Sequence, residues 1–127
     1  MSLYESMSKL VGGEWTVDTR SWFWCALPNG SDGAQFMFLA TRSGVPLQDS
    51  PQHLAEQAQK LWAQRGIEAG IDLDEQLDPS RRILSSPAWL TGTDRDGRLL
   101  HFIVGDNYAI FGGDSRCVEG EPNDQML

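Results

Sequence analysis

The sequence has few basic residues, and this shortage excludes one large class of partners. Lysine and arginine total 10, against 18 aspartate and glutamate residues, which gives a formal net charge of −8. Proteins that bind nucleic acids need clustered lysine and arginine to contact phosphates. We therefore expect no nucleic-acid partner. The charge leaves a basic protein, a cation or an uncharged ligand open.

Long apolar runs are also missing. No stretch of about twenty apolar residues occurs, so we expect no segment that spans a membrane. Residues 1–15 contain no apolar core of signal-peptide length. Two locations follow as alternatives: the protein is cytoplasmic, or the sequence begins after a removed export signal and the protein belongs to the cell envelope or is secreted.

Motifs for metals and cofactors are absent from the sequence as well. Neither histidine, His53 or His101, lies in an HExxH motif or a Cys/His cluster, and we expect neither a metal nor a cofactor. The turn DRDG at residues 94–97 lacks the alternating acids and distal glutamate of a calcium loop, so a hairpin turn is the better interpretation. The acidic segment 68–78 is interpreted as a solvated loop, with a cation or a basic partner as the alternative.

What the sequence does contain is a series of short apolar runs separated by turn residues. A chain of 127 residues with 13 glycines and 6 prolines suits one β-rich domain. We expect a single domain over residues 1–127, with an ordered core at about 13–120 and a polar, acidic tail at 121–127. Residues 1–12 are expected to form a loosely docked lead-in, with a short helix around Tyr4 to Leu10 as one form of it.

The pattern of these runs predicts the secondary structure. Alternation or apolar runs predict strands at residues 14–26, 35–41, 88–93, 98–104 and 108–111, the last three as an antiparallel meander. In the middle run, Phe102 and Val104 fall on one face, and His101 and Ile103 on the other, which suits a central strand covered on both sides.

One helix is expected among these strands. Leu54, Ala58, Leu61 and Trp62 form an apolar stripe over residues 51–65, preceded by Ser50 as a cap and followed by Gly66 as a stop. Residues 67–80 allow two interpretations, a short strand from Glu68 to Leu73 or one helical turn from Leu73 to Leu77. The sequence thus predicts an α+β fold: an antiparallel sheet of about five strands, in the order strand, strand, helix, optional short strand and three strands, with one amphipathic helix on one face.

Two groups of residues are candidate sites. Trp22, Trp24 and Trp89 form an aromatic patch, because Trp22 and Trp24 cannot share a face with Phe23 and need a cover of their own. Loop or core packing is the alternative interpretation, and a homodimer is a further possible cover. His101 with Tyr108 is a low-ranking polar site, since a buried, hydrogen-bonded histidine is the ordinary case.

The two cysteines, Cys25 and Cys117, are either buried thiols or one disulfide, and their count does not decide between them. Their contexts, CALPNG at residues 25–30 with Gly33 following and SRCVEG at residues 115–120, resemble the paired motifs of small actinobacterial exported proteins, often lipoproteins. The similarity spans residues 14–120. It implies a disulfide between the two cysteines, a location in the envelope and no known enzymatic activity. The sequence departs from that family at its start, where it has no signal peptide and no lipidation cysteine.

Three functions follow for testing. The first is an exported or envelope-associated, non-catalytic domain that binds an unknown protein or small ligand through its aromatic surface. The second is a cytoplasmic, acidic inhibitor of the immunity-protein type that neutralises a toxin; it uses the net charge of −8 and requires unpaired cysteines. The third is a small enzyme in which His101 acts with an acid.

Overall fold

Two helices and seven strands make up the described part of the chain, residues 2–42, 46–47, 49–74, 81–86 and 98–119 of a computed structural model. The elements in chain order are α1 (Leu3–Val11), β1 (Trp15–Ala26), β2 (Asp32–Arg42), α2 (Pro51–Gln64), β3 (Gly70–Asp74), β4 (Arg81–Ser86), β5 (Leu99–Val104), β6 (Ala109–Asp114) and β7 (Val118–Glu119).

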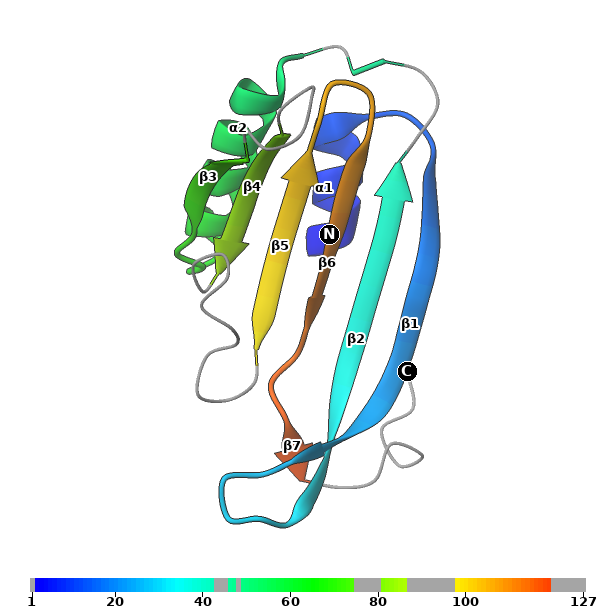
Figure 1. Ribbon diagram of the computed structural model, residues 1–127, viewed down its shortest axis with the longest axis vertical. Helices are drawn as coiled ribbons and strands as arrows, with labels where there is room; N and C mark the ends of the chain where they lie inside the picture. Colours follow the sequence, from blue (N-terminus) through cyan, green and yellow to red (C-terminus); the bar gives the residue numbers. More distant parts are fainter. Residues whose placement is uncertain (1, 43–45, 48, 75–80, 87–97, 120–127) are drawn as a thin grey trace.

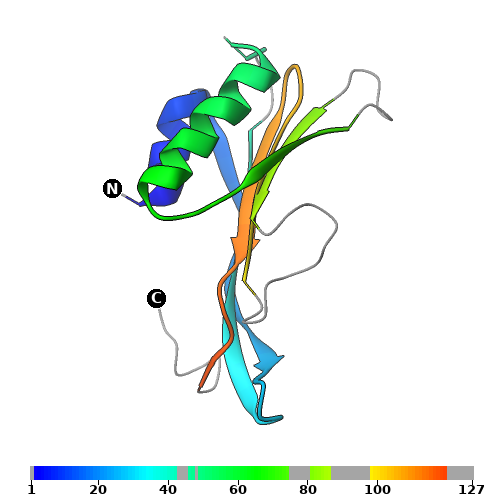
Figure 2. The same ribbon diagram turned by 90° about the vertical axis from the view of Figure 1, so that its left-hand side faces the viewer.

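All of the strands belong to one antiparallel sheet. Its order is β1-β2-β6-β5-β4-β3, and the short β7 pairs with β2 near the tip of the β1–β2 hairpin (Figure 1). Both helices lie on the same side of this sheet (Figure 2). The predicted α+β class, antiparallel sheet and helix-covered face are therefore confirmed, with a second helix and additional strands.

Helix α2 begins and ends where its sequence predicts. The hydroxyl of Ser50 accepts a hydrogen bond from the backbone N–H of His53 at 3.1 Å, and Pro51 occupies the first turn. At the other end, Gly66 adopts a φ of +79°, a conformation that costs other residues energy because of their Cβ atom. The backbone N–H of Ile67 returns to the carbonyl of Trp62, and this closes the helix.

Helix α1 corrects the expectation of a loosely docked lead-in at residues 1–12. Met7 and Val11 are buried in the core, so the segment is a structural helix. Its C-terminus is fixed by Arg42, which is 3% exposed and donates from Nε to the carbonyl of Gly12 at 2.7 Å. The indole of Trp15 donates to the same carbonyl at 3.2 Å. A cation at the end of a helix also favours the helix dipole.

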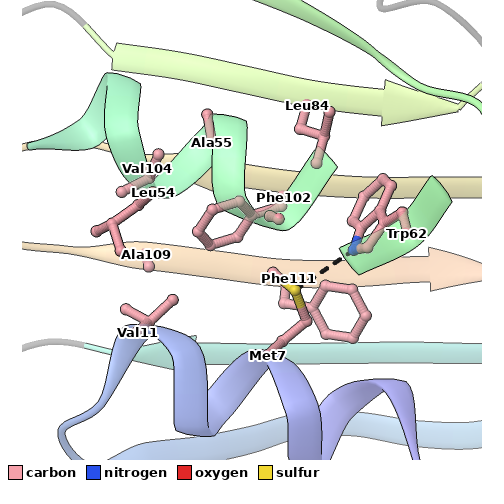
Figure 3. Close-up of a cluster of buried hydrophobic side chains, with 11 residues drawn as sticks. Met7, Val11, Leu54, Ala55, Trp62, Leu84, Phe102, Val104, Ala109 and Phe111 are labelled. Carbon is pink, nitrogen blue, oxygen red and sulfur yellow. Dashed lines mark hydrogen bonds between the residues drawn. The ribbon is translucent and has the colours of Figure 1, made fainter. Parts of the chain in front are cut away.

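The main core fills the space between the two helices and β4, β5 and β6 (Figure 3). Trp62 is fully buried at its centre, with its ring centroid 6.3 Å from that of Phe111. Its Nε1 donates to the sulfur of Met7 at 3.3 Å, which joins α2 to α1. The core therefore depends on α1, which supplies one of its walls.

The predicted meander is partly wrong in its pairing. Strands β5 and β6 pair as expected, but the other neighbour of β5 is β4 (Arg81–Ser86), a segment for which the sequence analysis predicts no strand. The predicted strand at residues 88–93 and the turn at 94–97 lie outside the described residues. The uncertain segment 67–80 contains strand β3, which pairs with β4, so its first part follows the strand interpretation.

Strand β1 contains an irregularity that sequence alternation does not reveal. The register with β2 shifts between Val17 and Thr19, as in a β-bulge. Val17 opposes Ala40 and Trp22 opposes Phe36, two positions that share one face of β2. Val17 thus lies on the same face as Trp22, whereas strict alternation along β1 would place it on that of Phe23.

Candidate binding site

A cavity of about 650 Å³ lies where the helix layer ends and the bare sheet begins. One wall is the first turn of α1, and Ile67, just after α2, contributes a second. The floor is formed by residues of β2, β5 and β6. Both helices cover one end of the sheet, and the β1–β2 hairpin extends well beyond them (Figure 2).

The floor of the cavity is aromatic because the strand register places its rings on one face. In the pairing of β2 with β6, Phe38 opposes Gly113, and Ala40, two residues further along β2, opposes Phe111. The rings of Phe38 and Phe111 therefore point to the same side of the sheet, the side of the helices. The ring of Tyr4 from α1 lies over them, 5.0 Å from Phe38 and 6.5 Å from Phe111 between centroids. Such offset and tilted pairs are favourable ring arrangements, so the rings form a connected apolar surface.

A glycine keeps the floor open beside these rings. Gly113 lies between Phe38 of β2 and Leu100 of β5 in the register. A Cβ at this position would run into the backbone carbonyl of Leu99. The strands therefore approach closely at Gly113, and no side chain fills the space above it.

The end of the floor is held by hydrogen bonds from Ser115. Its hydroxyl accepts from the backbone N–H of Phe36 at 2.8 Å, and its own N–H donates to the Phe36 carbonyl at 2.8 Å. The side-chain amide of Gln35 also donates to the Ser115 carbonyl at 2.8 Å. These bonds extend the contact between β2 and β6 past Asp114 and fix the position of Phe36 in the lining.

Four charged residues line the cavity as well: Arg20, Arg98, Glu5 and Asp114. Arg20 opposes Phe38 in the pairing of β1 with β2 and is exposed to solvent. Burial raises the pKa of the Asp114 carboxyl above its usual value, and the charge of His101 opposes that shift. The site is thus an apolar surface with charges of both signs around it.

The predicted aromatic patch is divided by the structure. Trp22 lies beside the cavity floor, with its ring centroid 5.4 Å from that of Phe36, and its indole nitrogen is buried without a hydrogen-bond partner among the described residues. Trp24 is 59% exposed further along the hairpin. Trp89 lies outside the described residues. The role of this patch stays a prediction.

His101 and Tyr108, the other predicted pair, are not brought together. The ring of Tyr108 packs over Gly105 at the β5–β6 turn, whereas His101 lies mid-strand above Gly112, on the face opposite to the helices. The acid that interacts with His101 is Asp114, a residue that the sequence did not single out. Burial lowers the pKa of His101, and the charge of Asp114 opposes that shift only in part.

A row of Ser85, His101 and Asp114 crosses β4, β5 and β6 on this face. Ser85 is fully buried, so its hydroxyl is not accessible to a substrate as a nucleophile would have to be. A buried imidazole whose pKa is lowered is uncharged near neutral pH.

Cys25 and Cys117 form a disulfide, as the motif resemblance implied, with their Cα atoms 6.0 Å apart. The bond joins the tip of β1 to the segment before β7, across a separation of 92 residues. Gly33 lies against the sulfur of Cys117, which leaves no room for a larger residue at that point.

The described residues contain neither a membrane-spanning helix nor a candidate metal cluster. No helix in that part of the chain has the length and apolar character needed to cross a bilayer. Nor do its histidine, cysteine, aspartate and glutamate side chains gather in groups of three or more that could hold a metal ion.

Comparison with known proteins finds a similarity in structure and none in sequence. No family model matches the sequence, and no curated protein matches it. Among solved structures, the chain is similar to a DUF4853 family protein from Actinomyces odontolyticus, an actinobacterium, with a TM-score of 0.59 and 18% identity. The alignment covers 99% of this chain and 68% of that protein. The similarity shows that the two proteins share a fold, and it is compatible with an uncharacterised domain.

Proposed function

We propose that this chain is a non-catalytic binding domain of the cell envelope, which takes a small apolar ligand in the cavity between α1 and the sheet. The observation that carries the proposal is the cavity itself. Its volume of about 650 Å³ lies within the range of about 300 to 1,000 Å³ typical of small-molecule sites. A floor of Phe36, Phe38 and Phe111 offers apolar contact area with little side-chain entropy to lose.

The disulfide supports the location. Disulfides persist in exported proteins and are rare in the cytoplasm of most organisms, where thiols are kept reduced. The bond between Cys25 and Cys117 therefore favours an exported domain over a cytoplasmic toxin inhibitor, which requires free thiols. The fold shared with an actinobacterial protein is compatible with this location but carries no information on the ligand.

Binding is tested with N-phenylnaphthylamine, an uncharged probe that fluoresces in apolar sites. We expect saturable binding to the wild-type protein. Ile67→Trp, which fills the cavity from its wall, should weaken binding by about tenfold or more. The matched control is Leu73→Trp, because Leu73 is 45% exposed on β3 and does not line the cavity. Equal binding by the two variants would place the probe elsewhere and contradict the proposal.

The location is tested by titrating thiols in the protein purified without reductant and unfolded in denaturant. Export predicts no titratable thiol before reduction and both cysteines after it. Two free thiols in protein isolated from its native source would contradict export and support the cytoplasmic inhibitor. This result would leave the cavity and its ligand unaffected, so the two parts of the proposal can fail separately.

A further inference from the structure

The charged residues around the cavity distinguish between classes of apolar ligand. The chain is acidic overall, yet two of its 10 basic residues, Arg20 and Arg98, line this one cavity. We infer that the ligand is a single-chain amphiphile with an anionic head group, whose chain lies over the aromatic floor and whose head is bound by Arg20. This inference rests on the proposed function.

The shape of the floor favours an extended chain. Phe38 and Phe111 continue into Leu100 on one side, and Phe36 lies two residues from Phe38 on the same face of β2. Tyr4 covers only the part of this surface nearest to α1. The uncovered part leads along β2 toward Trp22, whose ring contacts Phe36. A flexible alkyl chain can follow such a strip, whereas the strip offers few polar groups to orient a polar ligand.

Arg20 is the residue placed to bind the head. It belongs to β1, directly opposite Phe38, so its side chain leaves the sheet at the margin of the aromatic floor. Arg20 is exposed and has no hydrogen bond or ion pair among the described residues. A planar guanidinium presents several N–H donors to a carboxylate or a phosphate. Arg98, in contrast, already interacts with another group.

Two carboxylates at the cavity, those of Glu5 and Asp114, would repel an anionic head group, but the repulsion from each is reduced. Glu5 lies in the first turn of α1, where the partial positive charge of the helix N-terminus offsets its negative charge. Asp114 follows Gly113 in β6, so its side chain leaves the sheet on the face of His101, opposite to the aromatic floor. Arg20 has no such offset. The balance of charge therefore favours an anion at the β1 margin.

The test measures displacement of N-phenylnaphthylamine by four amphiphiles of the same chain length, each below its micellar concentration. Laurate and dodecyl phosphate carry anionic heads, dodecanol is uncharged, and dodecyltrimethylammonium is cationic. We expect both anions to displace the probe at concentrations about tenfold lower than dodecanol, and the cation to be the weakest. Comparing laurate with dodecyl phosphate tells a carboxylate head from a phosphate head.

The variant Arg20→Gln should weaken the binding of laurate by about five- to tenfold and leave the affinity for dodecanol within about twofold of its wild-type value. Arg20→Lys keeps the charge and should recover part of the loss. The control is Arg116→Gln, which removes the same charge from an exposed position outside the cavity and should change neither ligand.

The possible failures are distinct. If laurate and dodecanol displace the probe equally and Arg20→Gln has no effect, the anionic head is wrong and the apolar cavity remains. If dodecyltrimethylammonium displaces the probe at lower concentrations than the anions, the head group is cationic and is bound by Glu5 and Asp114, and the inference is overturned in the same way. If the probe itself does not bind in the cavity, the proposed function fails, and the inference fails with it.

Discussion

At one end of the sheet α1 and α2 pack over β5 and β6, whereas at the other end the β1–β2 hairpin extends beyond both helices (Figure 2). Trp62, Phe102 and Met7 are fully buried at the first end. At the second, Phe23 is 42% and Trp24 is 59% exposed, and a disulfide ties the strand tip to the segment before β7. The candidate cavity lies at the boundary between them.

The difference teaches how one sheet is stabilised in two ways. The covered end gains free energy of folding from buried apolar surface, at about 25 cal/mol for each Å² removed from water. The hairpin end buries little and is instead restrained by a covalent bond, which acts chiefly through the unfolded chain. A ligand surface at the boundary can thus remain partly uncovered without loss of the fold.

The largest expected effect comes from the covered end. Trp62→Ala should lower the free energy of unfolding by about 3 to 5 kcal/mol, because it leaves a cavity against Phe111 and removes the contact with Met7. Trp24→Ala, at the hairpin end, should change it by no more than about 0.5 kcal/mol. Chemical denaturation of both variants measures the contrast. Similar losses would show that the hairpin end is packed as tightly as the core.

Removal of the disulfide is expected to have the next largest effect. The double variant with Cys25→Ser and Cys117→Ser should lose about 2 to 4 kcal/mol, as expected when the unfolded chain gains the entropy of a long loop. Denaturation with and without reductant provides the measurement. A wild-type protein whose stability does not change on reduction would contradict the restraint that we assign to this bond.

A smaller loss is expected where α1 is attached. Arg42→Met keeps much of the side-chain volume but removes the charged donor to the Gly12 carbonyl, which should cost about 1.5 to 3 kcal/mol. Hydrogen exchange of the α1 amides should increase along with this loss. Normal protection of α1 in this variant would show that the buried core contacts of Met7 and Val11 alone hold the helix.

The smallest effect concerns pH. Burial lowers the pKa of His101 from its usual 6.5, so the unfolded chain takes up its proton first as the pH falls. The stabilisation from neutral His101 is fully present above pH 6.5, the usual pKa, and is lost as the pH falls from there toward the lowered pKa of the folded protein. Asp114 acts oppositely: burial raises its pKa above 3.8, so its stabilisation is present below 3.8 and is lost as the pH rises.

Between about pH 7.5 and 5.5 the wild-type protein should therefore lose more stability than His101→Asn. His53→Asn is measured alongside; His53 is exposed at the start of α2, where its imidazole contacts the Asp49 carboxylate. Thermal unfolding at several pH values tests this. An unchanged pH dependence in His101→Asn would mean that the imidazole is as well solvated in the fold as in the unfolded chain.

Much of the fold follows from local patterns. The cap at Ser50 and the stop at Gly66 predict α2 closely, and the alternation of Phe102 and Val104 with His101 and Ile103 matches the two faces of β5. Helix α1 has only nine residues, but it carries the same signal as α2: an apolar stripe at i, i+4, i+7 and i+8, which the prediction of a loosely docked lead-in overlooked. The stripe consists of Leu3, Met7, Leu10 and Val11, all of which lie in or against the core.

The site was harder to predict than the fold. The cavity depends on how far α1 reaches over the sheet and on Gly113. A glycine has no side chain, so its sequence position gives no chemical sign of a binding site. The bulge after Val17 changes which residues of β1 share a face. The alternation did place Trp22 and Trp24 on one face, and Trp22 does lie beside the cavity floor. Asp114 meets His101 only through the pairing of β5 with β6.

The most direct test of the central claim, that the boundary cavity is the binding site, is a titration of the amide signals in an ¹H–¹⁵N correlation spectrum with laurate. The account predicts that the largest shifts occur at Tyr4, Leu100 and Gly113, with little change at Ala26 or Asp32 near the hairpin tip. Shifts confined to the tip, or no saturable shifts at all, would contradict it.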